Sequence, residues 1–209
     1  MNVVELVSAT PEAEKTMAFI ARVSNPNNQD NKNFSGLLKY CIDHEHWSVF
    51  EQAYMTIQIE TNRGIAAQIL RHRSFTFQEF SQRYADPTKE LEFVTREARM
   101  QDPKNRQNSI PLDKDDTINY IWESYQEVVI ERCLQAYEWA IEAGIAKEQA
   151  RAVLPEGLTL SRLYVNGTLR SWIHYIELRR AHGTQEEHSL IAKECAKVIS
   201  EIFPYNEIL

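Results

Sequence analysis

The chain has 209 residues, of which 43% are hydrophobic and 25% charged, and this composition is typical of one globular domain over residues 1–209. No apolar run approaches the roughly 18 residues that span a bilayer, no signal-like segment opens the chain, and the net charge of -7 argues against a general nucleic-acid binder. We therefore expect a cytoplasmic protein, or one of the host cytoplasm if it is viral, in which positive charge for an anionic ligand is gathered locally.

The first half of the chain alternates predicted strands and helices. Val3, Val4, Leu6 and Val7 predict a short strand, and Thr10-Pro11-Glu12 is a typical helix opening with a cap, a proline and an early acid. A helix is predicted at 34–43, and a strand at 51–60 leads into a further helix capped by Asn62. The buried face of that strand carries Ala53, Met55, Ile57 and Ile59.

This further helix is predicted to end on Arg71-His72-Arg73, and residues 75–78 then alternate apolar and polar side chains as an extended strand does. If the register continues, Glu79, Ser81 and Arg83 point the same way. Arginines alone are also favoured at any helix C-terminus. Together, however, these groups make a credible pocket for an anion.

Residues 85–116 lose all periodicity, which predicts a loop beside this pocket that is either functional or a solvated excursion with one edge strand. A long helix follows at 117–143, and Gly144 stands where a left-handed cap is expected. We expect its wide apolar stripe to pack in the core, and part of it could form an oligomer interface.

The last helix runs to about Phe203 and is predicted to open with a capping box of Thr184 and Glu187. His182 and His188 are interpreted as solvent-exposed or capping histidines. Three shorter elements precede this helix: a helix at 146–154, a strand at 158–165 and a helix at 168–179.

Metal and thiol chemistry have little support in the sequence. Cys41, Cys133 and Cys195 are odd in number and far apart, and they lack CxxC spacing, so neither a disulfide framework nor a zinc site is predicted. His44 and His46 stand among acidic residues, but they are two apart and no HExxH pattern is present. We therefore expect no bound metal.

Four segments resemble the flavin-dependent thymidylate synthases. Arg71-His72-Arg73, seven further residues and then 81–84 (SQRY) resemble the family signature, and 46–51 (HWSVFE) is similar to its flavin-contacting HxSxFE segment. Arg151 matches the arginine of its RxVLP pattern, and 168–179 (TLRSWIHYIELR) is the fourth matched segment. Members of the family reductively methylate dUMP to dTMP.

The resemblance implies roles for individual residues. Arg179 would polarise the uracil ring and assist ionisation at N3. Ser81 is the tempting nucleophile, but no partner base is evident, so we interpret its hydroxyl as a positioning group. The implied flavin contacts are Ser48, Arg71, His72, Arg73, Glu79, Thr168, Leu169, Arg170 and His174. The implied nucleotide contacts are Gln68, Arg71, Glu79, Phe80, Ser81, Gln82, Arg83, Arg151 and Arg179; in the family a glycine is frequent at position 82 and an asparagine at 168.

The resemblance also implies an α+β fold, with an antiparallel sheet flanked by helices in a single domain, and a homotetramer with shared active sites. The implied substrates are dUMP and methylenetetrahydrofolate, with FAD as hydride carrier and NADPH as reductant, and neither nucleic acid nor membrane is a partner. A cysteine-dependent thymidylate synthase would need an activated thiol, whereas the three cysteines sit in apolar helical stripes. Two alternatives stay open: a metal-dependent nucleotide phosphohydrolase built on His44 and His46, and a non-catalytic flavin- or nucleotide-binding oligomer.

Overall fold

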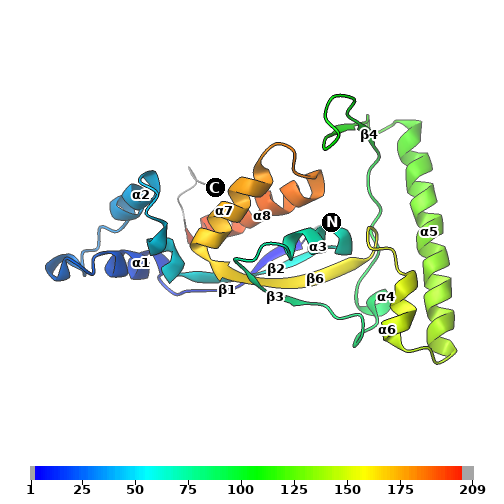
Figure 1. Ribbon diagram of the computed structural model, residues 1–209, viewed down its shortest axis with the longest axis horizontal. Helices are drawn as coiled ribbons and strands as arrows, with labels where there is room; N and C mark the ends of the chain where they lie inside the picture. The colour runs from blue at the N-terminus through cyan, green and yellow to red at the C-terminus, as the bar shows by residue number, and fades with distance from the viewer. Residues whose placement is uncertain (1–2, 204–209) are drawn as a thin grey trace.

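The structure is a computed structural model that describes residues 3–203, and it has the predicted α+β fold (Figure 1). An antiparallel sheet has the strand order β1-β2-β6-β3, and β4 and β5 pair separately as a hairpin. The strands are β1 (Val3–Ala9), β2 (Tyr54–Asn62), β3 (Thr76–Glu79), β4 (Arg99–Gln101), β5 (Ser109–Pro111) and β6 (Leu160–Thr168).

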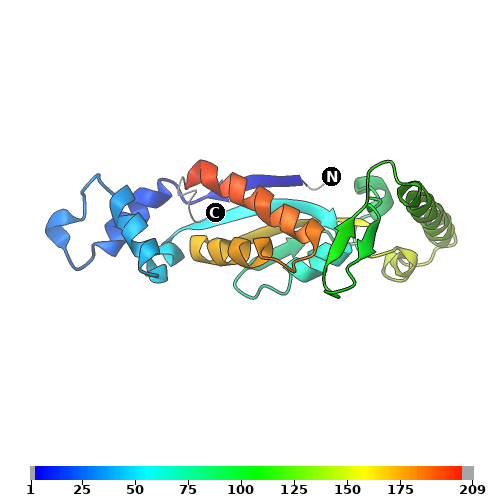
Figure 2. The same cartoon turned by 90° about the horizontal axis from the view of Figure 1, so that it is seen from above.

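The helices lie on one face and at the two ends of the sheet. Figures 1 and 2 show α7 and α8 side by side across one face, α1 and α2 at one end, and α5 with α4 and α6 at the other. No helix within residues 3–203 is long and apolar enough to cross a membrane. The helices are α1 (Ala13–Ala21), α2 (Ser35–Asp43), α3 (Arg63–Ile69), α4 (Pro87–Glu90), α5 (Thr117–Glu142), α6 (Lys147–Ala150), α7 (Leu169–Arg180) and α8 (Glu186–Ile202), and the 3-10 turns are η1 (Pro26–Asn28), η2 (Trp47–Gln52) and η3 (Arg151–Val153).

The centre of the sheet is the pairing of β2 with β6, which runs from Tyr54 opposite Thr168 to Asn62 opposite Leu160. The predicted alternation in β2 is confirmed, because its apolar side chains are buried against the helices while the other face is polar. Burying each large aliphatic side chain stabilises the fold by about 1.5–3 kcal/mol. The core between sheet and helices includes Met55, Ile57, Ile59, Leu163, Val165, Trp172, Ile173, Ile176, Ile191 and Ile199.

The start of β3 is fixed by a close contact between Gly167 and Phe75. A Cβ atom at Gly167 would lie 2.3 Å from the Phe75 ring, so any larger residue would displace this ring. Phe75 also packs on Trp172 of α7, with ring centroids 4.5 Å apart. The turn that precedes β3 is thereby held against α7.

Two predicted helix starts have different outcomes. Asn62 caps α3 as predicted, because its side-chain oxygen accepts the Ile65 N–H at 3.1 Å. The predicted cap at Thr10 is wrong: its hydroxyl accepts the Tyr54 N–H at 2.9 Å, and α1 begins only after Glu12, whose φ of 47° is left-handed. The Thr10 hydroxyl therefore bonds to the start of β2 and does not cap α1.

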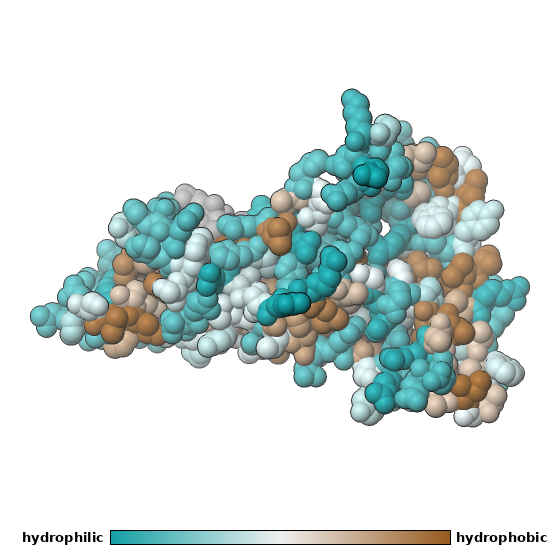
Figure 3. Space-filling model, in the orientation of Figure 1, coloured by the Kyte–Doolittle hydropathy of each residue, from teal (hydrophilic) through white to brown (hydrophobic). Residues whose placement is uncertain are grey.

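The long helix α5 forms as predicted and ends before Gly144, which has the expected left-handed φ of 82°. Core packing of its whole stripe, however, is wrong. Within α5 only Gln126, Tyr137 and Ala140 are buried, and apolar side chains gather on its outer surface at the right of Figure 3. The exposed set is Ile118, Tyr120, Ile121, Trp122, Tyr125, Val128, Val129 and Trp139.

The predicted loop over residues 85–116 is more ordered than its composition indicates. It contains α4 and the β4–β5 hairpin, and Phe93 forms an isolated antiparallel bridge with Thr159, just before the start of β6. At Phe93 the segment thus forms a single bridge and not the longer edge strand that the sequence allowed.

Candidate functional site

The segment Arg71-His72-Arg73 lies in a tight turn after α3. The helix ends at Ile69, so the predicted end on residues 71–73 is wrong. The N–H groups of Arg71 and His72 donate to the carbonyls of Gln68 and Ile69, three residues back, which tightens the chain as a 3-10 turn does. The turn leaves the side chains of Arg71 and Arg73 exposed and that of His72 partly buried.

His72 meets Arg179, which lies 107 residues further along the chain on α7. The Nε–H of Arg179 donates to Nε2 of His72 at 2.9 Å, so His72 is neutral and its proton is on Nδ1. Burial, and then the charges of Arg179 and Arg71, lower the pKa of His72 to about 4. The structure thus brings together two predicted site residues, one from each of the main matched segments.

Beneath this pair lies a buried histidine that the sequence placed at the surface. His188 is 0% exposed, which corrects the prediction of a solvent or capping histidine. The Tyr175 hydroxyl lies 3.0 Å from its Nε2, and its Nδ1 lies 3.2 Å from Oε1 of Gln68. Burial, and then the charge of Arg179, lower the pKa of His188 to about 3. A signal was present in the sequence, because Ile191, Ala192 and Cys195 follow His188 on one face of α8.

The hydrogen-bonded chain continues outward from Gln68. Its Nε2 donates to Oε1 of Gln185 at 2.7 Å, and Nε2 of Gln185 donates to Glu187 at 2.9 Å. Glu187 forms ion pairs with Arg96 and Arg99, so the predicted capping box of Thr184 and Glu187 is wrong. Although burial opposes it, the Glu187 backbone N–H and the two arginines lower the pKa of this carboxyl group.

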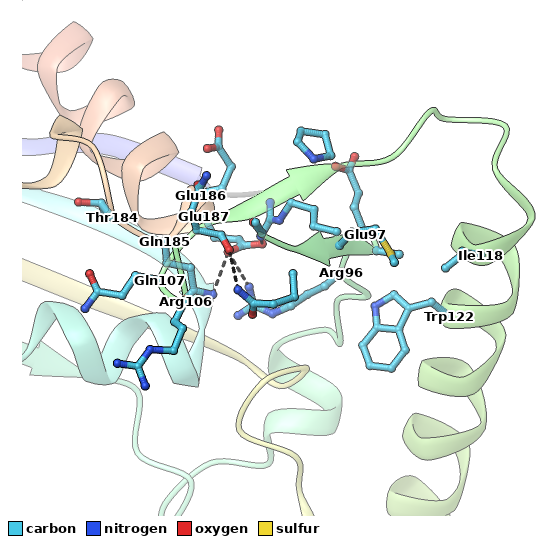
Figure 4. Close-up of a pocket in the computed structure, with 17 residues that line it drawn as sticks. Arg96, Glu97, Arg106, Gln107, Ile118, Trp122, Thr184, Gln185, Glu186 and Glu187 are labelled. Atoms are coloured by element: carbon cyan, nitrogen blue, oxygen red, sulfur yellow. Dashed lines mark hydrogen bonds and ion pairs between the residues drawn. The ribbon is translucent and has the colours of Figure 1, made fainter. Parts of the chain in front are cut away.

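Gln185 and Glu187 form part of the wall of a cavity of about 820 Å³ (Figure 4). It lies between the β4–β5 hairpin, the start of α5 and the start of α8, and none of the predicted site residues lines it. Arg96 and Arg99 in its wall both pair with Glu187, whose single negative charge offsets one of their two positive charges. The cavity is therefore a neighbour of the predicted site and meets it through the bond between Gln185 and Gln68.

A second group of predicted residues lies at the far end of β3. The strand ends at Glu79 and the chain turns at 81–84, so the predicted continuation of the register to Arg83 is wrong. Glu79 accepts from the Ser161 hydroxyl at 2.8 Å and pairs with Arg63 at 3.3 Å. The N–H of Phe80 donates to the carbonyl of Arg162, which holds this end of the strand against β6.

Three side chains of this group differ in how they are engaged. Arg83 forms an exposed ion pair with Glu148 at 3.4 Å, and Arg151 is half-buried at the start of η3. Gln82 is only 3% exposed, and its Nε2 has no hydrogen-bond acceptor in the described part of the chain. A buried donor without an acceptor is costly, so this amide is suited to a ligand oxygen.

The two groups of predicted residues lie at opposite ends of β3. An extended strand of this length spans about 13 Å. Arg71, His72 and Arg179 are therefore separated within one chain from Ser81 and Arg83.

The third group surrounds the start of α7, beside η2. Thr168 caps α7 by accepting the Ser171 N–H at 3.2 Å, and Arg170 pairs with Glu51 of η2. His174 contacts Trp47 edge to face at 4.8 Å, and Ser48 is exposed nearby on η2. Leu169 packs in the core and its N–H donates to Ala53, so its side chain is not presented at the surface.

Charge in these groups suits a flavin with its negatively charged phosphates. Arg71 and Arg73 are exposed, and neither takes part in an ion pair within residues 3–203. Guanidinium groups bind phosphate through paired N–H donors, and the Ser48 hydroxyl adds a further polar group. The side chains present therefore fit such a cofactor.

His44, His46 and His182 are exposed, whereas the three cysteines are buried or half-buried. His44 bonds through Nδ1 to the carbonyl of Tyr40 and stacks on its ring, and within residues 3–203 no group of three or more His, Cys, Asp or Glu could hold a metal ion. Burial raises the pKa of Cys41, Cys133 and Cys195, so each thiol stays protonated near neutral pH.

Comparison with known proteins identifies the family. A family model described as thymidylate synthase complementing protein matches residues 5–205. A probable flavin-dependent thymidylate synthase of Paramecium bursaria Chlorella virus 1 is 50% identical over 200 residues, which cover 95% of this chain and 91% of that protein. The flavin-dependent thymidylate synthase of a Synechocystis strain is 49% identical over 191 residues, or 91% of this chain and 86% of that protein.

A solved structure has the same fold. The crystal structure of PolB, a UMP/dUMP methylase from Streptomyces cacaoi bound with 5-Br dUMP, matches with a TM-score of 0.79 and 25% identity, over 96% of this chain and 90% of that chain. Sequence and structure agree, and the chain belongs to the flavin-dependent thymidylate synthase family of enzymes.

Proposed function

We propose that this enzyme reductively methylates dUMP to dTMP in the cytoplasm, with methylenetetrahydrofolate as carbon donor, FAD as hydride carrier and NADPH as reductant. The bond between Arg179 and His72 is the observation that carries the proposal. It places a guanidinium group in the turn of the family signature, within an otherwise acidic protein. The names of the relatives and the 5-Br dUMP bound by the PolB methylase support the same substrate.

Arg179 is the group that acts on the uracil ring in this proposal. Its Nε is engaged by His72, which leaves the two Nη groups to donate to the ring. A cation at this position stabilises the negative charge that develops when N3 ionises. His72 accepts the Nε–H only while it is neutral, and its lowered pKa keeps it neutral at physiological pH.

The nucleotide phosphate is assigned to Arg83 and Arg151, with Gln82 as an additional donor. The pair between Arg83 and Glu148 is exposed, and pairs of this kind contribute at most about 1 kcal/mol, so a phosphate can compete for the guanidinium group. The Nε2 of Gln82 gains an acceptor when the nucleotide binds. Ser81 positions the nucleotide, since within residues 3–203 no histidine or carboxylate bonds to its hydroxyl to make it a nucleophile.

Ser48, Arg71, Arg73 and His174 would hold FAD, which supplies the hydride chemistry that no side chain of this protein can provide. Arg71 and Arg73 contribute positive charge, and His174 is steadied by the ring of Trp47. Thr168 and Arg170 fix the start of α7 beside this group: Thr168 caps the helix, and Arg170 pairs with Glu51 of η2.

We also propose a homotetramer with shared active sites. The uracil-binding and phosphate-binding groups lie at opposite ends of β3, so a second copy can complete each site. The exposed apolar side chains of α5 offer a surface for that copy, because patches of this kind mark protein interfaces. Figure 3 shows them on the outer edge of the molecule.

Flavin content and tritium release test the proposal. Purified protein should be yellow, its spectrum should change with dUMP, and it should release tritium from C5-labelled dUMP in the presence of methylenetetrahydrofolate and NADPH. A preparation that neither contains nor binds FAD refutes the proposal. Flavin without tritium release would favour a non-catalytic flavin-binding oligomer, and a parallel assay with UMP would test the wider substrate range named for PolB.

A further inference from the structure

We propose that His188 is a positioning residue that fixes the side-chain amide of Gln68 so that it presents an N–H group to the nucleotide. The inference rests on the proposed function, in which Gln68 is a nucleotide contact. His188 itself is fully buried and touches no ligand in this arrangement. Its effect is exerted through Gln68.

With Oε1 of Gln68 facing Nδ1 of His188, the hydrogen bonds around His188 run in one direction. The amide oxygen of Gln68 carries no hydrogen, so Nδ1 of His188 must donate to it. The neutral ring then has a bare Nε2, which must accept from the Tyr175 hydroxyl. The chain from Tyr175 through His188 to Gln68 therefore has a single assignment of hydrogens.

This assignment determines which end of the Gln68 amide faces the surface. With Oε1 held by His188, Nε2 points toward Gln185 and donates one hydrogen to it, which leaves its second hydrogen for a ligand. A flipped amide would place NH₂ against Nδ1 of His188, and the ring proton would have to move to Nε2. While the proton stays on Nδ1, a flipped amide sets two donors against each other in a buried place, which is costly.

The same buried residues also support the Arg179 side of the site. The Tyr175 ring lies edge-on to the ring of His72 at 4.9 Å and is tilted by 45° against that of His188 at 5.7 Å. His72 in turn accepts from Arg179. These contacts link the position of the Gln68 N–H group to that of the Arg179 guanidinium group.

Substitutions at position 188 can separate the two bonds of the histidine. Asparagine places an N–H donor near the position of Nδ1 and keeps the link to Gln68, whereas His188→Leu removes both links. With FAD-loaded enzyme we expect His188→Leu to weaken dUMP binding at least about tenfold, or 1.4 kcal/mol, at unchanged flavin content. His188→Asn should stay within about threefold of the wild type. His182→Asn, at an exposed histidine in the turn that precedes α8, is the matched control.

A double-mutant cycle shows whether His188 acts through Gln68. Once Gln68→Ala has removed the amide, the added His188→Leu change should cause no further loss of dUMP affinity. A histidine that only supports the fold would add its own loss to that of Gln68→Ala. If His188→Leu does not fold, His188→Gln takes its place, because it reaches Tyr175 but carries its amide past Gln68.

The outcomes distinguish the positioning role from the nucleotide contact. The positioning role is wrong if Gln68→Ala weakens dUMP binding while His188→Leu does not, if the two losses add, or if asparagine is no better than leucine. If Gln68→Ala itself retains wild-type affinity, the proposed contact between Gln68 and the nucleotide is refuted, and the role of His188 with it.

Discussion

Arg179 donates its Nε–H to Nε2 of His72 across 2.9 Å, and this single bond joins α7 to the turn that follows α3. Because the bond occupies Nε, the outer edge of the guanidinium group stays available for a substrate. Lysine can supply the same charge but neither the Nε–H nor the planar fork.

Arg179→Lys therefore tests geometry at constant charge. We expect tritium release from C5-labelled dUMP to fall by about 100-fold, or about 2.7 kcal/mol, while the flavin content is unchanged. Arg180→Lys changes the exposed neighbouring arginine and should stay within about twofold of the wild type. Near wild-type turnover in Arg179→Lys would show that charge alone suffices.

The buried histidines predict a loss of stability in acid. His188 has a pKa of about 3 in the fold, because of burial and then the charge of Arg179, against an ordinary value of 6.5. As the pH falls below 6.5 the unfolded chain takes up a proton that the folded chain does not, so the free energy of unfolding falls until the pH reaches about 3. At pH 5 the loss is about 2 kcal/mol relative to pH 7.

Thermal unfolding at a constant protein concentration measures this effect. For a chain of this length a change of 2 kcal/mol lowers Tm by roughly 4–8 °C. The fall in Tm between pH 7 and pH 5 should be smaller by this amount in His188→Asn than in the wild type. His182→Asn should keep the wild-type difference, and an equal fall in all three proteins would contradict a buried neutral His188.

The sequence predicted the strands of the main sheet well because their signals are local. The alternation in β2 repeats every two residues, and the polar face it leaves is visible in a short window. His188 depends instead on α7 packing against α8 and on Gln68, 120 residues away. Its only local signal is its place on the buried face of α8, which identifies a buried histidine but not its partners.

The apolar stripe of α5 illustrates a different limit. Periodicity shows which side chains require burial, but it does not show whether they are covered by the same chain or by another copy. Most of the stripe is exposed in the single chain, although the spacing was read correctly. The sequence therefore predicts the helix and its apolar face, but it does not predict what packs against that face.

Tyr125→Glu tests that assembly. The ring of Tyr125 lies on the exposed apolar face of α5, and a charge that is buried there without a partner would destabilise an interface between copies. Sedimentation should show a smaller species, with folded secondary structure retained. Glu127→Gln, on a different face of the helix, should leave the wild-type mass unchanged. A Tyr125→Glu protein of unchanged mass would show that this face is not the interface.

Ser81→Ala distinguishes positioning from covalent catalysis. A hydroxyl that only orients the nucleotide should cost about tenfold in kcat/KM, in keeping with the loss of one hydrogen bond. Loss of a nucleophile would instead cost several orders of magnitude. The measurement is tritium release at varied dUMP concentration, with flavin content as the check on folding. A fall of about 10⁴-fold or more would establish Ser81 as a nucleophile.

Gln82→Met separates stability from binding. Gln82 is buried and its Nε2 has no acceptor among residues 3–203, so in the absence of a ligand the amide carries a desolvation cost of about 1–3 kcal/mol. Methionine has a similar length and no polar hydrogen, so Tm without nucleotide should rise. The affinity for dUMP should fall, because the same amide is expected to find its acceptor on the nucleotide. A lower Tm in Gln82→Met would show that the amide is already satisfied in the free protein, and an unchanged dUMP affinity would remove Gln82 from the nucleotide site.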